Sequence, residues 1–109
     1  GCVKPDFGSI DETALETVSV IENIVPDKEY KLCYSKDKKC VFVFETECSG
    51  NTLAQYPITL SVGGKPCISI SVSGGGSKFV RQFKLDGQED IFRFDFSNKI
   101  KLKKFLIKQ

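Results

Sequence analysis

The chain of 109 residues contains no histidine, and this absence removes a large group of chemistries. Catalytic triads of the Ser-His-Asp type, cysteine–histidine pairs and histidine-ligated metal sites all require an imidazole. The five cysteines therefore have no imidazole base that could activate a thiol nucleophile. We expect a protein that is not an enzyme and that binds no metal ion or other cofactor.

Long apolar runs are also missing. The longest uninterrupted apolar stretch is a few residues, far below the roughly 20 that a membrane-spanning helix needs. Hydrophobic residues make up 40% of the chain and charged residues 28%, which is ordinary for a folded globular protein. The length suits one core. The sequence therefore predicts a single domain over residues 1–109, in which residues 1–14 form an irregular lead-in.

Apolar and polar residues alternate along most of the chain, a pattern typical of strands with one buried face. The continuous apolar run at residues 41–44 predicts a central strand buried on both faces. Glycine-rich segments at 63–66 and 74–77 mark turns. The pattern predicts seven strands, at residues 29–34, 40–47, 57–62, 67–73, 78–85, 90–96 and 100–107. An eighth strand is expected near residues 16–22, after a turn or a short helix.

Strands at intervals of about eight to twelve residues, separated by glycine, are typical of a β-sandwich. The fold class predicted is therefore all-β, an antiparallel sandwich of the jelly-roll or Greek-key type with seven or eight strands. In the last strand the run Lys103-Lys104-Phe105 breaks the alternation. A β-bulge at this point would restore it.

Five cysteines without a C-x-x-C pair favour a disulfide-stapled exported domain over a zinc or redox site. Cys33 and Cys40 flank a polar stretch between two predicted strands, where they could face each other across a hairpin. Cys48 ends one predicted strand and Cys67 begins another, so they form the natural second pair. Cys2 is left unpaired, modified or available for an intermolecular bridge. We expect a secreted or cell-surface location.

Charge is unevenly distributed along the chain. Residues 1–29 contain seven acids and two lysines, whereas residues 30–109 contain fourteen bases and seven acids. The simplest interpretation is an acidic leading segment that lies against a basic body. The densest basic group consists of Lys99, Lys101, Lys103, Lys104 and Lys108, together with Arg93. This group could bind an anionic partner, but lysines on an edge strand also prevent aggregation. Without interleaved aromatic residues, a nucleic-acid partner is not expected.

The longest polar connection, residues 50–56, contains the candidate ligand-binding residues Asn51, Gln55 and Tyr56. The alternative is an ordinary surface loop with a partly packed tyrosine. A second tyrosine closes the segment 24–30, which resembles the corner before a strand in fibronectin-type sandwiches. In such corners the tyrosine hydroxyl binds the backbone. That resemblance implies a backbone contact for Tyr30.

Residues 40–107 resemble the closing part of a jelly-roll carbohydrate-binding module of the galactose-binding-like kind. The likeness rests on pattern: a core strand at 40–44, a strand and turn at 58–65, a glycine loop at 74–77, and strands at 91–96 and 100–107. It implies a non-catalytic module that recognises a glycan. The chain departs from that family because it has no tryptophan and only three tyrosines to stack on a sugar. We therefore rank a protein partner above a glycan partner.

Residues 58–64 and 103–107 also resemble a PLAT domain, the lipid- and protein-contacting sandwich appended to lipases and lipoxygenases. The resemblance implies a structural accessory domain of a larger exported protein. Such domains carry apolar loop tips, whereas the tips expected here are Gly, Ser, Asn and Lys, so membrane contact would need an anchor or a neighbouring domain. The leading hypothesis is an extracellular recognition or adhesion module, and the accessory domain is the alternative.

Overall fold

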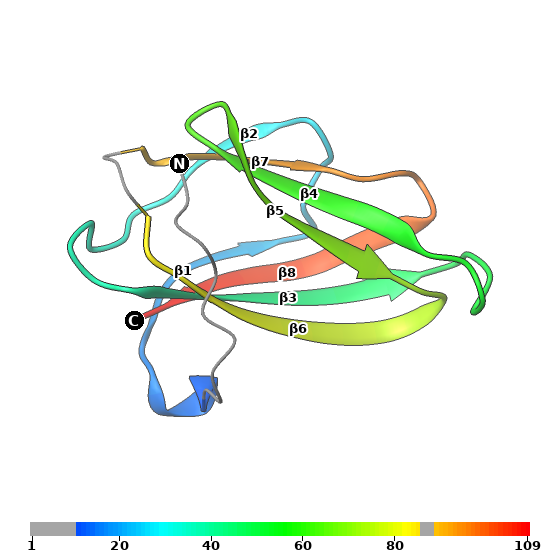
Figure 1. Ribbon diagram of the computed structural model, residues 1–109, viewed down its shortest axis with the longest axis horizontal. Coiled ribbons are helices and arrows are strands. Elements are labelled where there is room, and N and C mark those ends of the chain that lie inside the picture. The colour runs from blue at the N-terminus through cyan, green and yellow to red at the C-terminus, as the bar shows by residue number, and fades with distance from the viewer. Residues whose placement is uncertain (1–10, 86–88) are drawn as a thin grey trace.

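The computed structural model describes residues 11–85 and 89–109, and in this part of the chain eight strands form two antiparallel sheets (Figure 1). One sheet has the strand order β1-β8-β3-β6, and the other has the order β2-β7-β4-β5. A single 3-10 turn, η1 (Glu12–Ala14), precedes them inside the predicted lead-in. The strands are β1 (Thr17–Glu22), β2 (Glu29–Lys31), β3 (Cys40–Cys48), β4 (Tyr56–Val62), β5 (Lys65–Val72), β6 (Gly75–Phe83), β7 (Ile91–Asp95) and β8 (Ile100–Lys108).

Almost every connection between consecutive strands crosses from one sheet to the other. Only β4 and β5 are neighbours both in the sequence and in a sheet. Each sheet thus combines strands from both halves of the chain, which is the jelly-roll arrangement. The predicted all-β sandwich is confirmed. In Figure 1 the β3–β4 and β7–β8 connections lie together at the right-hand end of the sandwich, and the C-terminus lies at the opposite end.

Phenylalanine rings fill the space between the sheets, with Phe105 of β8 at their centre. The Phe105 ring packs against Phe44 and Phe42 of β3, with centroid distances of 5.1 Å and 5.3 Å. From the opposite sheet, Phe94 and Phe92 of β7 approach it to 4.9 Å and 6.0 Å. All five side chains are fully buried. The core is therefore a layer of edge-to-face and tilted rings joining both sheets, a favoured aromatic geometry.

A β-bulge at Lys103 brings Phe105 into this core. In the ladder between β3 and β8, Glu45 pairs with Lys104 and Thr46 with Leu102, so Lys103 has no opposite residue. The extra residue lets Leu102 and Phe105 both point inward although they are three positions apart, because side chains in a regular strand alternate with period two. The bulge predicted from the Lys-Lys-Phe run is confirmed.

The two predicted disulfide pairs are wrong. Cys33, Cys40 and Cys48 are free thiols. The polar stretch after Cys33 is not a hairpin, because it carries the chain from β2 in one sheet to β3 in the other. Cys48 ends β3 and Cys67 lies on β5, again in different sheets. The prediction for Cys2 falls outside the described residues.

The thiol of Cys40 is the most protected of the three. It lies at the start of β3, fully buried, and Gln109 Nε2 donates a hydrogen bond to its Sγ at 3.4 Å. Burial raises the pKa of Cys40 to about 11. Since the thiolate is the reactive form, Cys40 should react far more slowly than exposed Cys33.

We expect Phe105→Ala to destabilise the fold by about 3–5 kcal/mol, because it removes the ring that four others contact. Urea denaturation followed by circular dichroism measures the loss. Phe79→Ala is the matched control: Phe79 lies on edge strand β6 and is only partly buried, so its loss should be clearly smaller. Equal losses in the two variants would contradict a central role for Phe105.

We further expect at least three thiols per chain to react in denaturant without reductant. In the folded protein at pH 8, a short iodoacetamide pulse should label Cys33 first and Cys40 last. Peptide mass spectrometry identifies the labelled positions. Cys33→Ser should remove the thiol that is labelled first. Fewer than three thiols, or labelling of Cys40 ahead of Cys33, would contradict the structure.

Candidate functional site

An open groove of about 870 Å³ lies at the end of the sandwich where the β1–β2, β3–β4 and β7–β8 connections meet. Its volume falls within the range of roughly 300–1,000 Å³ that ligand sites occupy. Pro26 and Phe96 contribute accessible apolar side chains to its wall, whereas the other apolar lining residues, Ile24, Ile100 and Leu102, are buried in the core. Lys99, Lys101 and Glu47 contribute charged groups, and Gly75 and Gly76 contribute backbone.

The wall formed by the β1–β2 connection is held in place by two contacts. The hydroxyl of Tyr30 accepts a hydrogen bond from the backbone N–H of Val25 at 2.9 Å. This is the backbone contact implied by the resemblance to fibronectin-type corners. Two residues further on, Asp27 N–H donates to the carbonyl of Phe94 on β7 at 2.9 Å. Asp27 adopts a left-handed conformation, φ 68°, which aspartate tolerates better than most residues.

Charged side chains reinforce the docking of this connection on β7. Arg93 Nε lies 3.7 Å from Asp27 Oδ1 and 3.6 Å from Asp95 Oδ2, so one guanidinium bridges the connection and the strand. Burial and a hydrogen bond with Asp27 raise the pKa of Asp95. The groove wall is thus supported by backbone and side-chain contacts.

The facing wall, the β7–β8 connection, is also fixed by backbone contacts. Ser49 N–H donates to the carbonyl of Lys99 at 2.8 Å, and Ile100 N–H donates to the carbonyl of Ser97 at 3.1 Å. Cys48 and Ile100 are opposite each other in the ladder between β3 and β8. Lys99 and Lys101 therefore project from a backbone that is anchored on both sides.

The predicted basic surface divides into paired and unpaired lysines. Lys103 Nζ lies 3.2 Å from Glu47 Oε1, and Lys104 Nζ lies 3.9 Å from Glu22 Oε1. Lys99 and Lys101 are exposed and form no ion pair with the described residues. The structure thus places Lys99 and Lys101 in the groove and balances Lys103 and Lys104 with glutamates.

The second predicted site brings Asn51 and Tyr56 together, but in contacts within their own loop. Asn51 N–H donates to the Tyr56 hydroxyl at 3.4 Å, and Asn51 Oδ1 accepts from Leu53 N–H at 2.8 Å. The Tyr56 ring lies over Gly50 so closely that a Cβ there would overlap the ring. None of the three predicted residues lines the groove, and Gln55 is simply exposed.

All three tyrosine hydroxyls hydrogen bond to the backbone. The third, that of Tyr34, donates to the carbonyl of Glu89. Burial raises the pKa of Tyr34 to about 12. The ammonium of Lys36 lies 3.9 Å from the centre of the Tyr34 ring, and that of Lys28 lies 5.3 Å from the centre of the Tyr30 ring. The three tyrosine hydroxyls thus fix the backbone of the connections that they contact.

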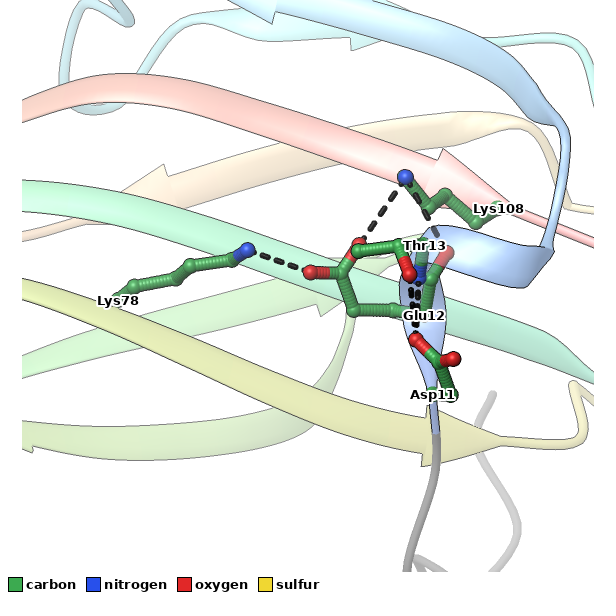
Figure 2. Close-up of polar contacts among 5 residues, drawn as sticks. All are labelled: Asp11, Glu12, Thr13, Lys78 and Lys108. Carbon is green, nitrogen blue, oxygen red and sulfur yellow. Dashed lines mark hydrogen bonds and ion pairs between the residues drawn. The ribbon is translucent and has the colours of Figure 1, made fainter.

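Figure 2 shows a cluster of charges away from the groove, centred on Glu12 of η1. The Glu12 side chain is about 10% exposed, and its two carboxylate oxygens bind Lys78 of β6 and Lys108 of β8, the latter at 3.0 Å. Lys108 Nζ also donates to the Glu12 carbonyl at 3.2 Å. These lysines lie on the two strands that flank β3, so the ion pairs of Glu12 hold the turn against the outer face of the sheet.

This cluster explains part of the charge asymmetry in the sequence. Glu12 and Glu22 from the acidic leading segment bind Lys78, Lys108 and Lys104 of the body, as the simplest interpretation predicts. Asp11 begins the turn, since its Oδ1 accepts a hydrogen bond from Thr13 N–H at 3.2 Å. We interpret this cluster as structural, because each of the two carboxylate oxygens of Glu12 already binds a lysine ammonium group.

Within 11–85 and 89–109, no group of three or more Cys, Asp or Glu side chains lies close enough to hold a metal ion. The same residues include no helix with the length and hydropathy of a membrane span.

The groove itself was not predicted from the sequence, because its walls come from four separate segments of the chain. Leu53 was also missed: it is 93% exposed near the tip of the β3–β4 connection, where only Gly, Ser, Asn and Lys were expected. Val25, half exposed in the β1–β2 connection, is a second apolar residue at this end.

No family model, curated protein or solved structure matches this chain.

We expect Glu12→Gln to lower the midpoint of thermal unfolding at pH 7 by roughly 5 °C. Hydrogen bonds from Lys78 and Lys108 lower the pKa of Glu12, so its charged form is stabilised by folding. This contribution is present above the unfolded pKa, near 4.5, and is lost as the pH falls through the lowered folded value. The difference between the variant and the unchanged protein should therefore vanish in acid. Glu16→Gln, at an exposed position, is the control and should leave the unfolding midpoint unchanged. If Glu12→Gln still lowered the midpoint in strong acid, the ion pairs of Glu12 would not be the cause.

Proposed function

We propose that this protein is a non-catalytic recognition module that contacts a partner protein through the groove at the loop end of the sandwich. The observation that carries the proposal is the groove, a hollow of about 870 Å³ with apolar walls. Loops fixed on a rigid scaffold are where binding residues are concentrated, and apolar concave surfaces release the most free energy when a partner covers them.

A glycan ligand has less support. A sugar-binding sandwich stacks a flat ring on the apolar face of the sugar. In this protein the Tyr56 ring packs over Gly50, while lysine ammonium groups lie over the rings of Tyr30 and Tyr34. Partner recognition by Asn51, Gln55 and Tyr56 is a weaker proposal for the same reason, since Asn51 and Tyr56 bind each other.

The alternative is an accessory domain of a larger protein that contacts lipid in the manner of a PLAT domain. One observation favours it: Leu53 and Val25 expose apolar side chains near loop tips at the same end of the sandwich. One strongly exposed leucine buries little area in a membrane, so we rank this function second.

A location outside the cell belongs to the proposal as well, and rests on the number of cysteines. Because three of the five are free thiols, at most one disulfide can form within the chain.

Three panels distinguish these functions: a random-peptide display library, a glycan array that includes heparin fragments, and vesicles of phosphatidylcholine with and without phosphatidylserine. We expect saturable binding of selected peptides and none to glycans or vesicles. Gly76→Phe should abolish peptide binding. A Cβ at Gly76 would have only Thr46 O near it, at 3.8 Å, so the ring fits the backbone and fills the groove.

Ser69→Phe is the matched control, because it adds the same ring at an exposed position on β5, in the other sheet. It should bind the selected peptides normally. Glycan binding that is lost on Tyr56→Ala, vesicle binding that is lost on Leu53→Asp, or no binding to any panel would each overturn the proposed function.

A further inference from the structure

We propose that the groove selects an acidic peptide segment, in which aspartate or glutamate side chains lie next to apolar ones. This inference rests on the proposed function and adds the chemistry of the partner. It follows from the two properties of the groove that a partner must match: the charge of its rim and the character of its walls.

The charge of the rim comes from two lysines that have no carboxylate partner among the described residues. Four other lysines of the same sheet have carboxylate partners: Lys103 binds Glu47, Lys104 binds Glu22, and Lys78 and Lys108 bind Glu12. By contrast, Lys99 and Lys101 are exposed at the groove without an ion pair to the described residues.

Glu47 also lines the groove, and it does not cancel the charge of Lys101. The two residues are cross-strand neighbours in the ladder between β3 and β8. The Glu47 carboxylate instead binds the ammonium of Lys103 at 3.2 Å. An incoming carboxylate would therefore meet Lys99 and Lys101 as the free cations of the rim, and oppositely charged groups at an interface set both the association rate and the specificity.

The walls argue for a peptide and against a polyanion. Pro26 and Phe96 give the groove apolar surface that a sulfated glycan or a nucleic-acid backbone would leave uncovered. A polyanion would also approach Glu47, and it would find only two free lysines, too few for the dense phosphate contacts that such binding requires. A segment that alternates acidic and apolar side chains satisfies both the rim and the walls.

Fluorescence anisotropy with three labelled, capped peptides tests this inference. In the first, glutamate alternates with leucine and phenylalanine; in the second, lysine replaces glutamate; in the third, serine replaces the apolar residues. We expect the first peptide to bind at least tenfold more tightly than either of the others. Its affinity should fall as the ionic strength rises.

The double variant Lys99→Glu with Lys101→Glu should weaken binding of the first peptide at least tenfold. The control, Lys31→Glu with Lys65→Glu, makes the same change in net charge. Lys31 lies on β2, where it pairs with Asp90, and Lys65 is the first residue of β5. Neither lysine lines the groove. The control should change binding less than threefold.

The outcomes separate this inference from the proposed function. If library peptides bind in a manner sensitive to Gly76→Phe but lack acidic residues and tolerate the Lys99 and Lys101 changes, the inference is wrong and the proposed function stands. If no peptide responds to Gly76→Phe, both are wrong. If the control variant weakens binding as much as the double variant, the attraction is due to net charge and the inference is overturned.

Discussion

The bulge at Lys103 is the constraint on which both the core and the groove depend. A regular strand through β8 that kept Phe105 inside would turn Lys101 and Lys103 inward and Leu102 outward, because side chains alternate with period two. The extra residue instead keeps Leu102 and Phe105 in the core and leaves Lys101 at the groove. The same residue therefore completes the aromatic layer between the sheets and sets the charge of the rim. Bulges are over-represented at sheet edges and next to active sites, where they redirect a side chain.

Most of the strands could be predicted from the sequence, because each is encoded locally in alternation and turn residues. Residues 40–44 are buried on both faces, as a continuous apolar run indicates, and the bulge was visible in the Lys-Lys-Phe run. The pairing of strands is not local. In a jelly roll, consecutive strands cross between sheets, so two cysteines close in the sequence, such as Cys33 and Cys40, do not face each other. The Cys33–Cys40 prediction was wrong because it assumed a hairpin, whereas among the eight strands only β4 and β5 form a hairpin.

The same division between local and non-local information applies to the groove. The contact between Tyr30 and Val25 spans five residues, and a resemblance over seven residues was enough to predict it. Asn51 and Tyr56 also lie five apart, and their contact explains why polar residues in a long loop are not by themselves a ligand site. The groove brings Pro26, Gly76 and Phe96 together across about seventy residues of sequence. No periodicity or spacing in the sequence indicates that these three residues lie close together. Their proximity follows from the order of the strands in the two sheets.

Net charge is a poor guide to partners here, and the reason is geometric. The chain carries a formal charge of +2, yet its lysines fall into two environments. On the outer face of the β1-β8-β3-β6 sheet, glutamates from β1, β3 and η1 bind lysines from β6 and β8, which neutralises a surface that would otherwise repel itself. At the loop end, Glu47 already binds Lys103, and Lys99 and Lys101 form no ion pair with the described residues. The ion pairs of Lys103 and Lys104 are exposed and add little stability, so their main effect is on the electrostatic potential. They leave Lys99 and Lys101 without an ion pair among the described residues beside the groove, where the proposed acidic segment would bind.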